Sequence, residues 1–175
     1  MKRFTLVLAV LLVGTLAATS GFAASSGTSA VTLAASANEV LQIIDNTLTL
    51  TPNATDYAND YVELTGASGL RVRLKSNSTT GVVLFVKCTD ASPQIALADF
   101  LVRTGTAAGV GGSTLSSYTA VTAADQALWS TGVAQTTFQQ VRTDIRVQNL
   151  FVYPDAITAG TTSYTDNLTF TAISQ

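Results

Sequence analysis

Alternation of apolar and polar residues is the clearest pattern in this sequence. Over residues 70–75, Leu and Val alternate with Arg and Lys, and residues 141–148 repeat the pattern with Val and Ile against Arg, Asp and Gln. A third alternation, rich in Thr, runs over residues 164–172. Because successive side chains of a strand point to opposite faces, each segment predicts a strand with one buried and one solvated face.

Other segments extend this prediction. Residues 82–88 are almost continuously apolar, which predicts a more buried strand, and the Ser-Asn-Ser-Thr-Thr-Gly turn before them predicts a hairpin with the strand at 70–75. We expect the strand that begins at Val141 to continue through residues 150–152. Residues 40–50 predict one long or two short strands around Asp45 and Asn46.

Weaker strand patterns lie at residues 30–35, 61–64 and 117–121. Residues 90–101 fit either a helical or a strand period; we favour a strand with a short helical turn near Pro93. In all, seven to ten short strands with turn residues between them predict an all-β antiparallel sandwich or barrel. The Gly-rich residues 105–113 are expected to be an exposed loop, since they lack the Lys that a phosphate-binding loop needs.

The N-terminus has the layout of a secretory signal peptide. Lys2 and Arg3 precede an apolar run over residues 4–13, and small residues flank a cleavage position after Ala23. The run is shorter than the roughly 20 residues that span a membrane. We therefore expect a signal peptide at residues 1–23, a flexible leader or donated strand at residues 24–37, and a β-sandwich domain at residues 38–175. The expected location is the periplasm or the surface of a bacterium, with no membrane span in the mature chain.

The amino-acid composition excludes several kinds of catalytic and binding site. The 175 residues include nine Lys and Arg, eleven Asp and Glu, one Cys and no His. Histidine-based catalysis and an internal disulfide framework are therefore excluded, and no basic stripe is available for nucleic acid. The carboxylates are scattered singly, without the pairing of a glycosidase. We expect no enzymatic activity and no cofactor. Cys88, which ends an apolar run, is interpreted as a buried residue, with an intermolecular bridge as the alternative.

One segment has the oxygen ligands that calcium prefers. Its side chains are Asn53, Asp56, Asn59 and Asp60. The spacing is not that of an EF-hand, and Asn and Asp are also common in ordinary loops. A calcium site and a hydrogen-bonded loop are the two interpretations, and the second is favoured.

Candidate binding residues are equally open. Trp129 could form an aromatic platform for sugars together with a Tyr, or belong to the core. The two charged rows contain Arg71, Arg73, Arg142 and Arg146. We interpret these rows as solvated sheet faces that form cross-strand charge pairs if their strands are neighbours. An anionic glycan or a partner subunit is the alternative.

Three stretches resemble bacterial spore-coat-U-like and fimbrial-type secreted domains. They are residues 159–171, with Gly, an aromatic and a Thr-rich closing strand, residues 30–41, and residues 72–81. The resemblance implies an immunoglobulin-like β-sandwich, export, and assembly into a surface fibre or coat. In fimbrial subunits of this kind, one chain donates a strand to its neighbour. Many such domains contain a disulfide, and this chain has a single Cys.

The sequence therefore predicts a secreted, non-enzymatic structural or surface protein, such as a fimbrial or coat-like subunit. A secreted, non-catalytic binding module for a glycan or a cell-surface partner is the alternative. Residues 24–37 are small and uncharged, and we expect self-association through them, because edge strands of a sandwich pair readily with other chains.

Overall fold

A computed structural model describes residue 33 and residues 35–105, 112–153 and 164–175. The chain divides into two units, residues 1–34 and residues 35–175, and every described element belongs to the second unit. The predicted signal peptide, most of the leader and much of the Gly-rich segment lie outside the described residues.

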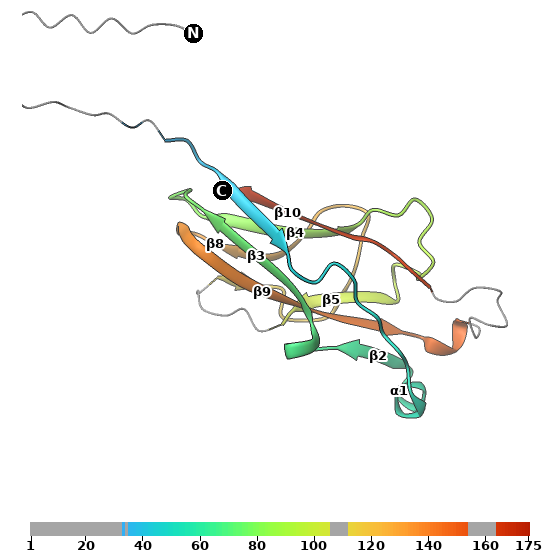
Figure 1. Cartoon of the computed structure of the whole chain (residues 1–175). Coiled ribbons are helices and arrows are strands. Elements are labelled where there is room, and N and C mark those ends of the chain that lie inside the picture. Colours follow the sequence, from blue (N-terminus) through green and yellow to red (C-terminus); the bar gives the residue numbers. More distant parts are fainter. Residues whose placement is uncertain (1–32, 34, 106–111, 154–163) are drawn as a thin grey trace, which may run out of the picture. The chain divides into compact units, whose positions relative to one another are not determined.

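The described residues form an all-β sandwich, as expected, with two antiparallel sheets and ten strands (Figure 1). Sheet A contains β1 (Glu39–Ile43), β3 (Leu70–Ser76), β9 (Gln135–Gln148), β5 (Phe100–Thr104) and β7 (Thr119–Ala120) in that order. β2 (Tyr61–Leu64) pairs with the end of β9, and so lengthens the same sheet. Sheet B has the order β10 (Leu168–Ser174), β4 (Val82–Cys88), β8 (Gln126–Thr131) and β6 (Ser113–Thr114).

The core lies between the sheets and is aliphatic. Val72, Leu74, Val82, Leu84 and Val102 have no exposed surface. These side chains come from alternate positions of β3, β4 and β5, which is the period-two arrangement expected of strands buried on one face. The charged residues of these three strands, Arg71, Arg73, Lys75, Lys87 and Arg103, all occupy outward positions, so burial and charge are separated by face.

The predicted hairpin between residues 70 and 88 is wrong. β3 and β4 have nearly the predicted bounds, but β3 belongs to sheet A and β4 to sheet B. Their connection crosses from one sheet to the other, and Gly81 at its end lies against Thr131 with a positive φ of 97°. Both strands bury one face in the same core, and crossing between sheets satisfies that requirement as well as a hairpin does.

Three other segments differ from the predictions. Of the 40–50 segment, only residues 40–43 form a strand, as part of β1, and residues 91–99 form turns and bends before β5. The strand of residues 141–148 ends at Asn149, whose φ of 58° starts the short 3₁₀ helix η2 (Leu150–Val152). A residue in this left-handed conformation breaks the extended backbone that a strand needs.

Two helical segments interrupt the strands between β1 and β3. Helix α1 (Ala54–Asn59) precedes β2, and the 3₁₀ helix η1 (Gly66–Ser68) follows it. Within the part of the chain that the structure describes, no helix has the length and apolar character needed to cross a membrane.

Candidate functional site

Two edge strands meet on one side of the sandwich. β1 ends the order of sheet A and β10 ends that of sheet B, so among the described strands each pairs on one side only. β1 and β10 are in contact and run side by side (Figure 1). An unpaired strand edge presents backbone donors and acceptors that another chain can bind.

The side chains between these two strands are incompletely covered. The register places Leu41 and Ile43 of β1 opposite Leu74 and Val72, and therefore toward the core. Ile43 is nevertheless 42% exposed, although Val72 opposite is fully buried. We call the inward-facing apolar residues of both strands the edge seam: Leu41, Ile43, Leu168, Phe170 and Ala172.

Polar atoms at one end of the edge seam have no partner. Glu39 and Ser174 are the inward residues that precede Leu41 and follow Ala172. The Oε1 atom of Glu39 and the Oγ atom of Ser174 are buried, and neither has a hydrogen-bond partner among the described residues. A buried polar atom without a partner costs about 1–3 kcal/mol. An added strand could supply such partners and cover Ile43.

Residues 36–38 lie beside this end. Asn77, in the connection after β3, donates from Nδ2 to the carbonyl of Ser36 at 2.8 Å and accepts at Oδ1 from the backbone of Asn38 at 2.6 Å. The backbone N–H of Asn77 also donates to the carbonyl of Asn38 at 3.3 Å. Residues 36–38 are thereby held at the start of β1, next to Glu39.

The two charged rows belong to the outer face of sheet A, on neighbouring strands β3 and β9. The expected cross-strand charge pairs between the rows do not form, because the register places Arg71 opposite Arg142 and Arg73 opposite Gln140. Arg71 instead pairs with Asp45, which follows β1, at 2.6 Å, and Arg142 donates to the carbonyl of Ala67 at 2.9 Å.

A second cluster occupies the other half of the same face. The guanidinium of Arg146 lies between the rings of Tyr61 and Tyr118, 4.2 and 4.1 Å from their centroids, and binds Glu63 at 2.7 Å. Arg103 stacks on the same Tyr118 ring at 4.5 Å. Burial and the hydrogen bond to Glu63 raise the pKa of Tyr118 to about 12. Stacking and pairing satisfy every charge of this cluster, which makes it a rigid support.

An open hollow of about 460 Å³ adjoins this cluster beside Asp144 and Arg103. The carboxylate of Asp144 accepts from Arg103 at 3.0 Å and from the backbone of Gly66 at 2.9 Å. Both oxygens are therefore engaged, and the hollow presents no unpaired charge from Asp144.

The calcium candidates have a structural role. The segment is a helix, not the expected loop. The Asn53 side chain caps α1 by accepting from the backbone of Thr55 and Asp56, and the Asp56 carboxylate accepts from the backbone N–H of Asn53 at 2.8 Å. This capping box uses two of the four side chains. Asp60 ends α1 with a φ of 58°, and Asn59 is exposed. The described residues contain no group of three or more acidic or Cys side chains arranged to hold a metal.

Trp129 and Cys88 belong to the core. Trp129 is 2% exposed on β8, so its ring faces are not accessible to a sugar. Cys88 is buried at the end of β4, and burial raises the pKa of its thiol. Little of the thiol is therefore in the reactive thiolate form.

Comparison with models of known protein families, with curated proteins and with solved structures gave no significant match.

Sequence reasoning missed the edge seam and the stacked cluster. Both depend on which strands become neighbours. Tyr61, Tyr118 and Arg146 come from three distant segments that only the pairing of β2, β9, β5 and β7 brings together. The sequence showed a row of outward-facing charged residues. It did not show the strand register, which decides which of these residues pair.

Proposed function

We propose that this chain is an exported, non-enzymatic structural subunit that assembles into a surface fibre or coat. The edge seam carries this proposal: two neighbouring edge strands leave Ile43 exposed and leave polar atoms of Glu39 and Ser174 unpaired. An extended segment of another copy, paired along either edge, would cover these groups and complete the backbone hydrogen bonds.

Residues 24–37 are the proposed donor. They are rich in Ala, Ser and Thr and contain no charge, so they can enter a partly apolar seam without burying an ion. In its own chain this segment leads directly into β1, at the end where Asn77 holds residues 36–38. We propose that this segment, which joins β1 at that point, pairs with the edge seam of a neighbouring copy.

The experiment compares the chain that begins at residue 24 with the chain that begins at residue 38. Sedimentation velocity over a range of concentrations should show oligomers for the longer chain and monomers for the shorter one. Ile43→Lys in the longer chain should also reduce oligomers, whereas Gln42→Lys, on the solvated side of β1, should not. Equal oligomer distributions for both chain lengths would contradict strand donation.

The second candidate is a non-catalytic glycan-binding module. One observation favours it: Tyr57 of α1 and Phe151 of η2 form an exposed aromatic pair with ring centroids 5.6 Å apart. Aromatic faces stack on the apolar faces of sugars. A strict monomer that binds a glycan, and loses binding on Phe151→Ala but not on Val133→Ala at another exposed apolar position, would support this function.

A further inference from the structure

The outer face of sheet A carries a concentrated positive charge. Arg71, Arg73, Lys75 and Arg142 project from β3 and β9, and we call these four residues the basic patch. Asp45 is the one carboxylate within ion-pair distance of the patch among the described residues, and it pairs with Arg71. The other three cations have no ion pair there, so the patch has a large net positive charge in a chain that is negative overall.

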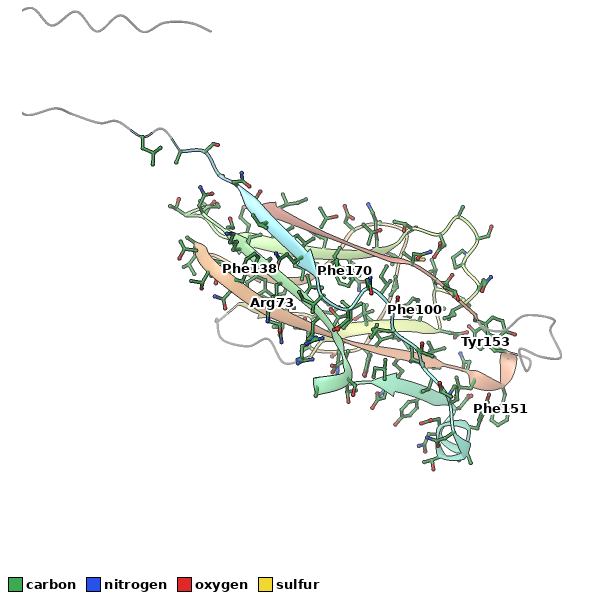
Figure 2. The ribbon with its side chains drawn as sticks, viewed as in Figure 1. Arg73, Phe100, Phe138, Phe151, Tyr153 and Phe170 are labelled. Atoms are coloured by element: carbon green, nitrogen blue, oxygen red, sulfur yellow. The ribbon has the colours of Figure 1, made fainter. Side chains whose placement is uncertain are left out.

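Apolar side chains lie within the basic patch. Phe138 is 39% exposed, and the ammonium of Lys75 lies 5.0 Å from its ring centroid. Val40, opposite Lys75 on β1, is 38% exposed. Figure 2 shows Phe138 and Arg73 on the neighbouring strands of this sheet. Aromatic and Arg side chains of this kind dominate the energy of protein interfaces.

The opposite end of the sandwich has the complementary composition. There α1 and η2 hold Tyr57, Phe151 and Val152, which are 40%, 76% and 65% exposed (Figure 2 labels Phe151). Asp56 and Asp60 flank Tyr57, and neither forms an ion pair with a described residue. We call these five residues the acidic end. It presents apolar anchors beside two carboxylates.

One chain cannot bring these two surfaces together. Arg73 lies opposite Gln140 on β9, whereas Asp60 precedes Tyr61, which lies opposite Gln148. At roughly 3.3 Å per residue, the two levels are about 26 Å apart along the strand. This distance exceeds the electrostatic screening length of about 8–10 Å at physiological salt. The charges of the basic patch and those of the acidic end therefore do not neutralise each other within one molecule.

We propose that the acidic end of a second copy of this chain docks on the basic patch. The inference rests on the proposed function, because it supplies a second contact for the same assembly. A free anion would meet the cations but would leave Phe138 and Val40 without an apolar partner. The acidic end offers carboxylates and apolar side chains together. Because the two surfaces differ, the contact is head-to-tail and extends into an open filament unless its rotation closes a ring.

The test uses the chain from residue 24 onward and two charge variants. Arg73→Glu makes the patch more negative. Asn59→Lys with Asp60→Asn makes the acidic end more positive, and Asn keeps the left-handed conformation of position 60 accessible. At low salt, each variant alone should associate about tenfold or more weakly than the unaltered chain, as measured by sedimentation velocity. An equimolar mixture of the two should regain association, because the unaltered basic patch of one variant then meets the unaltered acidic end of the other.

A matched control separates local from net charge. Ala127→Lys with Ile173→Lys adds the same charge as the acidic-end variant, at exposed positions on the outer side of sheet B. This control should associate like the unaltered chain. Phe151→Ser should weaken association without changing net charge, and about 0.5 M salt should weaken it by screening.

The outcomes distinguish the two contacts. If oligomers survive high salt and both charge variants but vanish when residues 24–37 are removed, strand donation holds and docking on the patch is wrong. If they survive that removal but vanish in both charge variants, docking holds and strand donation is wrong. A monomeric unaltered chain at low salt, or glycan binding that Phe151→Ser abolishes in a monomer, also overturns docking.

Discussion

Arg71 of β3 lies directly opposite Arg142 of β9, so two guanidinium groups project from adjacent positions of one sheet face. Like charges in opposite positions destabilise a sheet. Asp45 offsets part of this repulsion, and its hydrogen bond from the Arg71 side chain holds the pKa of its carboxyl below the ordinary value. The pair is therefore expected to cost stability in the isolated chain.

Arg142→Gln tests that cost. The change removes the repulsion on Arg71 and retains an amide donor for the Ala67 carbonyl. We expect the variant to be slightly more stable than the unaltered chain at low salt, with the gain disappearing at high salt as the repulsion is screened. Urea unfolding at two salt concentrations measures this. A variant that is less stable by the same amount at both would show that the repulsion is negligible.

Gly81→Ala should destabilise the fold by about 2 kcal/mol or more. A Cβ at this position would lie 1.7 Å from the carbonyl oxygen of Thr131, and the φ of 97° is unfavourable for any L side chain. Gly132→Ala is the matched control, since a Cβ there meets nothing within 4 Å. Thermal and urea unfolding should separate the two variants. Equal stability would contradict the close approach of the β3–β4 connection to β8.

Two buried threonines should respond oppositely to replacement by Val. Thr143 is fully buried on β9, and its Oγ1 has no partner among the described residues, so Thr143→Val should raise the free energy of unfolding by about 1 kcal/mol. Thr104 donates to Leu128 at 2.5 Å and accepts from Leu115 at 3.0 Å. Thr104→Val should therefore cost about 1–3 kcal/mol. Urea unfolding checks the sign of each change.

Asn53→Ala should destabilise the chain by about 1 kcal/mol, because it removes the cap of α1. Asn59→Ala, in the same helix without a capping role, should be neutral, since Ala is the best helix former. If the four side chains serve only as a cap and a helix end, millimolar Ca²⁺ should leave the melting temperature of the unaltered chain unchanged. A rise in melting temperature that Asn53→Ala abolishes would instead support a calcium site at these residues.

Two tyrosines should ionise late in an alkaline titration. Burial, followed by hydrogen bonds to Glu63 and Asp99 respectively, raises the pKa of Tyr118 and that of Tyr153 to about 12. Because these folded-state pKa values lie above the unfolded value near 10, their stabilising contribution is complete below pH 10 and is lost between about pH 10 and 12. Ultraviolet titration should show a phase near pH 12 that is halved in Tyr118→Phe. An unchanged late phase in that variant would refute the assignment.

Sequence pattern identified the strands that alternate and failed where alternation is interrupted. β3, β4, β2 and the C-terminal half of β9 follow the predicted bounds closely, because one face of each is buried and the other is not. β8 was missed, since Leu128 and Trp129 are both buried in succession beside a register shift between Leu84 and Phe85. Such a bulge destroys the period of two that a sequence can show.

The candidate sites show the same limit. Which residues carry charge is visible in a sequence, but the opposition of Arg71 and Arg142, and the stack of Arg146 between two rings, depend on register. A one-residue shift would turn each of these side chains to the other face. The edge seam depends on strand order, which no local pattern contains.

The separation of the basic patch from the acidic end gives these two surfaces of the described residues the character of a dipole. A dipole exerts a torque on an approaching copy, and this rotates the two molecules into opposite-pole contact before they touch. If copies dock as proposed, their encounters are oriented in advance, and added salt should slow the association rate much more than it changes the dissociation rate. The uneven placement of charge would thus steer diffusing copies of the chain before they come into contact.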